Sequence, residues 1–338
     1  MKHLVLLSFF LCMLCSCVNH QSTEKYQNNR NKIIYVKDKI KEINLDDLLV
    51  SGFSSLYEAN EYLFVCDYHA YDKLIHIVDK MSFEHIASVG QKGEGPDEIT
   101  NMGSLSFNEP ERLFYVIDHG KVKIFDYSID SLLVNPQYVP KIRMSINTSS
   151  FPVSFYYISD TLCIGNAMTP RKDGPYDMGL VKWNMLKGEL QSFGYVHPQI
   201  ERKRTCFDVS EEEGLYVEAY SHHDLLTICD LKGNLCFNVY GSEWNDRTQN
   251  IYSYYDEVKW YGDKIITSYA EGRSRGQSDK LADLPTKFLV FDKNGEYQCT
   301  LDVGYKIQNF VCDEENKRLI INMNDTMQFG YLDLNGLI

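Results

Sequence analysis

The 338-residue sequence predicts an all-β fold, a six-bladed β-propeller whose last blade is closed by a strand from the N-terminal part of the chain. Three observations support this prediction. A unit of paired strands recurs about every 50 residues, which is a period typical of propeller blades. Aromatic residues are frequent, with Tyr 24 and Phe 17, and no long helical stripe accompanies them. A spare strand precedes the first unit.

Each unit contains an apolar strand, a polar turn and a second strand, which in most units ends in Asp. An Asp at this place bonds to the backbone of the turn that follows. The predicted pairs are Leu63–Asp67 with Lys73–Asp79, Leu113–Asp118 with Lys121–Asp126, Thr161–Gly165 with Gly179–Trp183, Leu215–Tyr220 with Leu225–Asp230, Lys264–Ser268 with Lys287–Asp292, and Arg318–Asn322 with Met327–Asp333. Six such units indicate a propeller.

The last unit ends soon after its third strand, so one outer strand is missing there. The segment Lys32–Val36 alternates like a strand, and we expect it to pair with the last unit near Phe329. Such pairing would close the ring and remove an exposed sheet edge.

The glycine-rich segment Gly90–Thr100 is predicted to be the crossing between the first two units. Gly93 and Gly95 permit a tight path, and Glu98 is placed to hold it. A phosphate-binding loop would need a terminal Gly-Lys-Ser/Thr and a following helix, and neither is present.

The N-terminus has the pattern of an export signal. Residues 1–16 carry a short polar start and the apolar run Leu4–Leu14, which is too short to span a bilayer as a stable helix. The sequence Leu14-Cys15-Ser16-Cys17 resembles the lipobox of bacterial lipoproteins, which implies cleavage before Cys17 and lipidation of its thiol. An ordinary signal peptide is the alternative. We expect residues 17–31 to form a lipidated flexible tether and residues 32–338 to form the propeller.

The residues after Cys17 indicate which membrane the expected lipoprotein would occupy. Val18 is not the Asp that retains some lipoproteins in the inner membrane, and no acidic run that would favour surface export follows. We therefore expect an outer membrane lipoprotein that faces the periplasm, with the cell surface as the alternative.

Composition limits the class of partner. The formal net charge is -13, and the one basic cluster, Glu201–Arg204, is short, so nucleic acid is not expected as a partner. The cysteines beyond Cys17 lie mostly in apolar strand segments and do not have the spacing of a disulfide scaffold. Cys229 and Cys236 flank a predicted turn, where a disulfide is an open alternative.

The lipobox, the six units and the crossing Gly93–Glu98 together resemble the six-bladed β-propeller lipoproteins of Bacteroides-type bacteria. Those proteins are in turn similar to NHL-repeat and TolB-like propellers. The resemblance implies a fold and a location in the cell envelope, and it implies no particular activity.

In a propeller, the crossing between blades lies on the same face as the turns between second and third strands. That topology predicts a polar rim around one mouth of the central funnel, where propellers commonly bind ligands. Each residue of this predicted rim is also of a type that is common in turns. We expect Asp67 and Asp118 to cap their turns. The predicted ligand-binding residues are His69, His119, Asn166, His222, His223, Glu271, Arg273 and Asn324.

Function follows only in outline from these residues. We expect a non-catalytic propeller that binds a peptide, a glycan or an envelope protein through this rim. The alternative is a metal-dependent hydrolase or lyase in the funnel. Histidine with carboxylates suits zinc or a harder cation, and Asn166, Glu271 and Asn324 resemble the calcium ligands of lactonase-type propellers. No H-x-x-x-H spacing and no G-x-S-x-G elbow is present, so we expect no cofactor and assign no catalytic residue.

Overall fold

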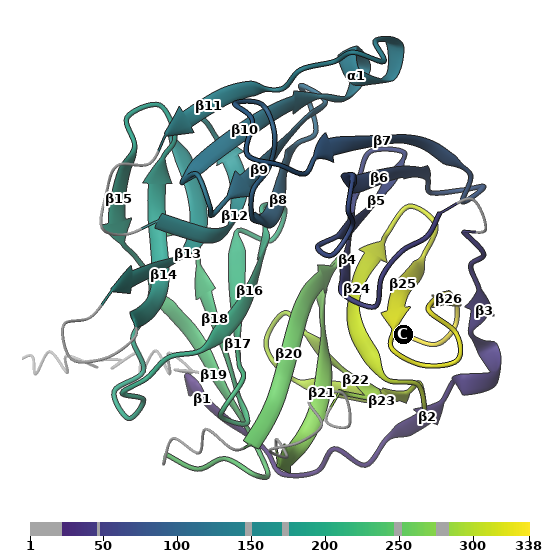
Figure 1. The fold of residues 1–338 in the computed structure, drawn as a ribbon. Coiled ribbons are helices and arrows are strands. Elements are labelled where there is room, and N and C mark those ends of the chain that lie inside the picture. The colour runs from purple at the N-terminus through teal and green to yellow at the C-terminus, as the bar shows by residue number, and fades with distance from the viewer. Residues whose placement is uncertain (1–21, 46–47, 146–150, 171–175, 247–251, 275–283) are drawn as a thin grey trace, which may run out of the picture.

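The computed structural model describes residues 22–45, 48–145, 151–170, 176–246, 252–274 and 284–338. Within these residues six mostly antiparallel sheets surround a central axis (Figure 1). We number the sheets as blades 1 to 6 in chain order, and the first strand of each blade lies innermost. The predicted six-bladed β-propeller is confirmed.

The first three blades have four strands each. Blade 1 contains β4 (Ser54–Ala59), β5 (Tyr62–Asp67), β6 (Lys73–Asp79) and β7 (His85–Gln91). Blade 2 contains β8 (Met102–Asn108), β9 (Leu113–Asp118), β10 (Lys123–Ser128) and β11 (Lys141–Ser145), with the short helix α1 (Ile129–Val134) after β10. Blade 3 contains β12 (Phe151–Ser159), β13 (Leu162–Pro170), β14 (Tyr176–Asn184) and β15 (Glu189–Ser192).

The last three blades each take a strand from the N-terminal segment. Blade 4 contains β16 (Thr205–Ser210), β17 (Leu215–Tyr220), β18 (Leu225–Asp230) and β19 (Leu235–Gly241), with β1 (Glu24–Gln27) outermost. Blade 5 contains β20 (Tyr252–Tyr261), β21 (Lys264–Ser274), β22 (Lys287–Asp292) and β23 (Tyr297–Asp302), with β2 (Ile33–Tyr35) outermost. Blade 6 contains β24 (Ile307–Asp313), β25 (Arg318–Met323) and β26 (Phe329–Asp333), with β3 (Lys41–Glu42) outermost.

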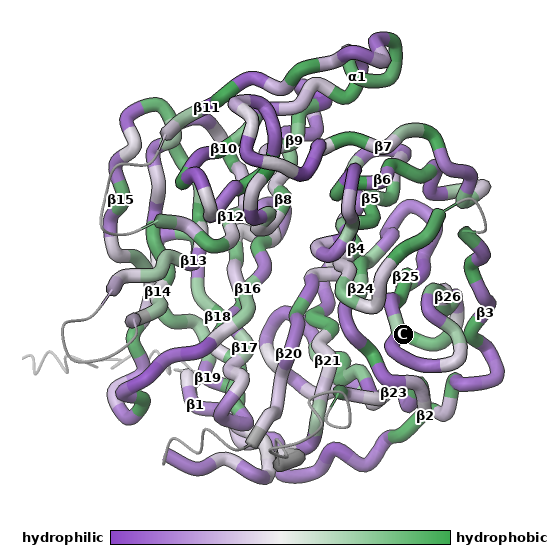
Figure 2. The backbone as a smooth tube through the Cα atoms, viewed as in Figure 1, coloured by the Kyte–Doolittle hydropathy of each residue, from purple (hydrophilic) through white to green (hydrophobic). Residues whose placement is uncertain are grey.

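The core lies between neighbouring blades. All residues of β5 and β25 are buried, because both faces of each middle strand are covered by adjoining sheets. Phe64 in blade 1 packs against Phe114 in blade 2 with ring centroids 5.2 Å apart, and Phe288 packs against Phe310 across blades 5 and 6 at 4.7 Å. Figure 2 shows hydrophobic stretches along the strands and hydrophilic stretches in many of the connecting loops.

An N-terminal strand closes the last blade, as predicted, but it is not the predicted one. β3 pairs with β26 through Glu42 and Gly330 and through Lys41 and Tyr331. The expectation that Lys32–Val36 pairs with the last unit is wrong, because β2 lies parallel to β23 on blade 5. Both outer edges need a partner, and the chain reaches blade 5 first, so the alternating segment is used there. A strand as short as β3 has no alternation that the sequence could reveal.

The segment predicted as a tether is also partly ordered. β1 runs parallel to β19, with Glu24 opposite Asn238 and Gln27 opposite Gly241. Between β1 and β2, the side chain of Arg30 enters the protein and its Nη1 lies 2.8 Å from the buried carboxylate of Asp224. Residues 24–42 therefore form a strap over the outer edges of blades 4, 5 and 6, drawn in purple in Figure 1.

The segment Gly90–Thr100 is a structural crossing, as predicted. Lys121 Nζ donates to the carbonyl oxygens of Gly95, at 2.5 Å, and Glu98, at 2.7 Å. The Glu98 carboxylate accepts the N–H of Gly95 at 2.7 Å. A Cβ at Gly95 would lie 2.9 Å from the carboxyl carbon of Glu98, so a larger residue at this position would displace that carboxylate.

Closure through β3 can be tested at Ile43, whose N–H donates to Phe329 O at 2.9 Å and whose side chain is 5% exposed. Ile43→Ala should lower the free energy of unfolding by about 2–4 kcal/mol, because it leaves a cavity. Ile43→Pro should cost about 1–2 kcal/mol more, because it also removes the N–H. Urea unfolding followed by tryptophan fluorescence measures both. Equal losses in the two variants would show that this hydrogen bond does not hold the ring closed.

Candidate functional site

The predicted rim residues of the first three blades lie in different environments. His69 is exposed in the turn between β5 and β6, with its ring 4.4 Å from that of Phe53. His119 is half-buried against Phe151, and burial lowers the pKa of its imidazole. Asn166 is buried and donates from Nδ2 to Thr205 O at 3.1 Å.

His223 belongs to the core. Its side chain is 2% exposed, its ring packs between Tyr220 and Trp244, and its Nδ1 lies 3.1 Å from Asn245 O. Burial lowers the pKa of this histidine. The neighbouring His222 is half-buried, so the two imidazoles differ in exposure as their adjacent places in the chain lead us to expect.

The predicted rim residues of the last two blades either have local partners or have side chains outside the described residues. Glu271 is exposed and forms an ion pair with Lys287 at 2.5 Å. The N–H of Asn324 donates to Lys306 O at 2.8 Å. The backbone of Arg273 pairs with β20, and its side chain lies outside the described residues, as does Cys17.

The two carboxylates that precede the turn histidines cap their turns, as expected. Asp67 accepts hydrogen bonds from the N–H groups of Ser51 and His69. Asp118 accepts from Thr100 N at 3.0 Å and from Asn101 N at 2.9 Å. Each Asp thereby ties the turn of its blade to the segment that enters the same blade.

Two cavities open along the central axis, and the eight rim residues do not gather in either. A cavity of about 470 Å³ lies on the rim face, where the first strands begin, and His69 is its one member of the predicted set. It is lined by Phe53, Ser54, Ser55, Tyr68, His69, Asp256, Glu257, Gln308 and Asn309. Of the predicted set, only Asn166 lines the second cavity.

The second cavity, of about 730 Å³, is the central channel. Residues from the first strand of every blade line it, from β4 in blade 1 to β24 in blade 6. Six glutamates lie at or just after the ends of four of these strands, so they surround the mouth opposite the predicted rim. We call this set the acidic mouth: Glu58, Glu109, Glu211, Glu212, Glu314 and Glu315.

Sequence reasoning missed the channel because it assigned only the second and third strands of each unit. The first strands contain many half-buried side chains, so they look less apolar than the middle strands. The glutamates after β8, β16 and β24 resemble ordinary turn residues. The recurrence of these glutamates at equivalent positions in three blades is the sequence feature from which the acidic mouth could have been predicted.

The channel is strongly acidic. Eight carboxylates and two lysines line it, because Asp208 and Glu257 add to the acidic mouth while Lys80 and Lys259 oppose them. Burial raises the pKa of Glu58 to about 7, although Lys80 Nζ lies 3.1 Å from its carboxylate. Burial likewise raises the pKa of Asp208, against the attraction of Lys259.

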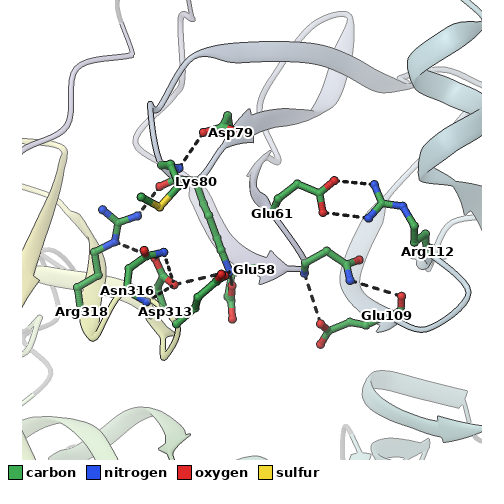
Figure 3. Close-up of polar contacts among 12 residues, drawn as sticks. Glu58, Glu61, Asp79, Lys80, Glu109, Arg112, Asp313, Asn316 and Arg318 are labelled. Carbon is green, nitrogen blue, oxygen red and sulfur yellow. Dashed lines mark hydrogen bonds and ion pairs between the residues drawn. The ribbon is translucent and has the colours of Figure 1, made fainter.

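Ion pairs fix one side of the acidic mouth across blades 6, 1 and 2 (Figure 3). Arg318 Nε contacts Asp313 at 2.8 Å, and Nη2 of the same guanidinium donates to Lys80 O. Arg112 of blade 2 forms a two-pronged pair with Glu61 of blade 1, at 2.7 and 2.9 Å. Hydrogen bonds from Arg112 lower the pKa of Glu61 to about 2.

Aromatic rings form much of the remaining channel wall, and they come from five of the six blades. They are Tyr57, Phe107, Phe155, Tyr156, Tyr157, Phe207 and Trp260. Rings beside carboxylates can contact the apolar face of a sugar or an organic cation.

The alternative function, a metal-dependent hydrolase or lyase, would need a cluster of metal ligands. In the described part of the chain, no three His, Cys, Asp or Glu residues lie close enough together to hold a metal ion. Asn166 lines the channel, whereas Glu271 is paired with Lys287 and Asn324 lines neither cavity. Cys229 and Cys236 are free thiols, so the disulfide considered between them is not formed.

These features define a six-bladed β-propeller with a polar, acidic central channel. Residues 26–157 match the model of a family, DUF5128, described as a 6-bladed beta-propeller. A search of curated protein sequences gives no match.

Solved structures extend the likeness over most of the chain. A DUF4221 family member from Bacteroides vulgatus has 12% identity and a TM-score of 0.58, covering 86% of this chain and 94% of that one. A putative exported protein from Bacteroides fragilis has 11% identity and a TM-score of 0.51, covering 88% and 87%. A luciferin-regenerating enzyme has 8% identity and a TM-score of 0.54, covering 86% and 93%. At these identities the likeness shows the fold.

The described residues include no helix that is both long and apolar enough to cross a bilayer.

The raised pKa of Glu58 gives a test of the channel's electrostatics. Since the folded pKa of about 7 exceeds the ordinary value of 4.5 for glutamate, this group destabilises the fold progressively as pH rises between those values. Glu58→Gln removes the titration, so its free energy of unfolding should rise relative to that of the unaltered protein between pH 5 and pH 8. Denaturant unfolding at several pH values measures the difference. Glu111→Gln removes one charge from an exposed turn and controls for net charge, and a parallel trend in both variants would contradict the assignment.

Proposed function

We propose that this protein is an exported, membrane-anchored binding protein that holds its ligand in the central channel without catalysing a reaction. The channel carries the proposal, because its volume of about 730 Å³ is that of a ligand site and its wall combines aromatic rings with polar groups. A volume of this size accommodates a short peptide segment, a small glycan or a loop of an envelope protein. The channel replaces the rim as the main site, and His69, which lines the smaller cavity on the rim face, keeps a secondary role in the proposal.

The proposed address rests on the N-terminal sequence. Residues 1–16 have the pattern of an export signal, and Cys17 ends a segment that resembles a lipobox. A putative exported protein of Bacteroides fragilis shares the fold, which is compatible with an envelope location. We place the protein at the outer membrane by lipidation of Cys17, with the periplasmic face favoured over the cell surface.

The anchor would be short. Residues 18–23 separate Cys17 from β1, and a fully extended chain of that length spans about 20 Å. The edge of blade 4, where β1 lies, would therefore remain close to the membrane.

The alternative of a metal-dependent hydrolase or lyase has less support. One similar fold is a luciferin-regenerating enzyme, but the described residues of this chain contain no group of three His, Cys, Asp or Glu side chains that could hold a metal ion. Metal analysis of the purified protein separates the two proposals, because bound calcium or zinc at one ion per chain would favour the enzyme.

Lipidation of Cys17 can be tested by membrane fractionation and fatty-acid labelling. Full-length protein expressed in its native envelope should partition with membranes and incorporate a labelled fatty acid. Cys17→Ala should incorporate none and should lose nearly all membrane association, because the acyl chains supply the anchoring free energy. Cys66→Ala, at a buried thiol, is the matched control and should behave like the unaltered protein. Labelling that survives Cys17→Ala would rule out this anchor.

Binding in the channel predicts a loss on obstruction. Ser154 lines the channel, so Ser154→Trp should fill part of it, while Ser192→Trp adds the same group at an exposed position on β15. Thermal shift against an array of short peptides and oligosaccharides should identify ligands that stabilise the unaltered protein and Ser192→Trp. At about 100 times its Kd a ligand contributes about 2.7 kcal/mol, and this effect should vanish in Ser154→Trp. Ligands that stabilise both variants equally would place binding elsewhere.

A further inference from the structure

The free polar groups of the channel are mainly acceptors of hydrogen bonds. Asn166 is 3% exposed and lines the channel. Because its Nδ2 donates to Thr205 O, the orientation of the amide is fixed, and Oδ1 is buried with no hydrogen-bond partner. A buried carbonyl oxygen without a donor is costly, so this atom indicates a place for a donor from a ligand.

The carboxylates of the acidic mouth are only partly satisfied by the protein. Glu211 accepts from the hydroxyl of Tyr156 at 3.4 Å, and Glu314 accepts from Gly262 N at 2.7 Å. A carboxylate has about four acceptor sites, so single contacts of this kind leave most of that capacity free. The two lysines of the channel wall are engaged, since Lys80 contacts Glu58 at 3.1 Å and Lys259 contacts Glu257 at 3.2 Å.

The distribution of charge distinguishes between kinds of cation. The acidic mouth draws its glutamates from blades 1, 2, 4 and 6, and no three acidic, His or Cys groups in the described residues are close enough to bind one metal ion. Spread charge of this kind suits several positive groups held apart on one molecule. The aromatic rings of the wall, such as Tyr156 and Trp260, add faces on which an ammonium or a guanidinium group can rest.

We propose that the central channel binds a ligand with two or more protonated amine or guanidinium groups, which enters through the acidic mouth and donates to Asn166 Oδ1. This inference rests on the proposed function, because it names the chemistry of the ligand of the same channel. A lysine- or arginine-containing peptide and a free polyamine share this chemistry.

The test is isothermal titration calorimetry of the full-length protein in mild detergent at pH 8. The probes are trilysine, spermidine, triglutamate and the neutral sugar maltotriose. Trilysine or spermidine should bind with one-to-one stoichiometry, and the affinity should fall as salt is raised from low to high concentration. The stronger of the two probes identifies a peptide or a polyamine as the source of the cation.

Paired variants locate the binding. Glu211→Gln with Glu212→Gln neutralises two members of the acidic mouth and should weaken cation binding about tenfold, a change of about 1.4 kcal/mol. Glu111→Gln with Glu213→Gln removes the same charge from residues that do not line the channel and should change the affinity by less than about twofold. If the first pair is poorly folded, Glu315→Gln in blade 6 replaces it.

The outcomes separate this inference from the proposed function. Binding of maltotriose or triglutamate that Ser154→Trp abolishes and that the glutamate variants leave unchanged would overturn the cationic ligand and retain the binding channel. Absence of heat with both trilysine and spermidine would overturn the cationic ligand directly. If no peptide or sugar of any charge binds in a manner sensitive to Ser154→Trp, the proposed function itself fails.

Discussion

Closure of the ring between blades 6 and 1 is the constraint on which the rest of the structure depends. The seam is polar as well as apolar, since Ser54 O accepts hydrogen bonds from the side-chain amides of Asn309, at 2.7 Å, and Asn322, at 2.8 Å. The Oδ1 of Asn309 in turn accepts the N–H of Leu56. With these groups paired, every blade has a neighbour on both faces, and burial of the middle strands follows. The central channel exists only because the first strands are held at a fixed distance by the closed ring.

The sequence predicts those parts of the fold whose residues have one dominant environment. The middle strands β5 and β25 are buried on both faces, so they show as apolar runs that end near a turn-forming polar residue. The caps Asp67 and Asp118 were predictable for a related reason, because short carboxylates after a strand satisfy nearby N–H groups. The pairing of the edge strands could not be predicted in this way. β1 and β3 have mostly exposed or half-buried side chains, and only the free edges of distant blades determine where they pair.

The candidate site likewise has a part that the sequence predicts and a part that it does not. Strand order alone placed the rim turns and the crossing Gly90–Thr100 on one face, and the contacts of Lys121 agree with that placement. Strand order could not show which mouth is hollow, because the volume of a channel depends on side chains contributed by every blade. Asn166 illustrates the difference, since the strand pattern predicts it in a turn and it lies instead within β13 on the channel wall.

The position of β3 also affects the order in which the protein folds. β3, at residues 41–42, pairs with β26, at residues 329–333, so nearly the whole chain must be present before this contact can form. Contacts between such distant residues carry a large loop-closure entropy and form late. While the chain is being synthesised, the N-terminal strap has no finished blade to cover, and the sheet edges of the last blades do not yet exist. The outer strand of blade 6 is therefore added only after residues 329–333 have been synthesised, so the ring closes at the end of folding and not while the chain is growing.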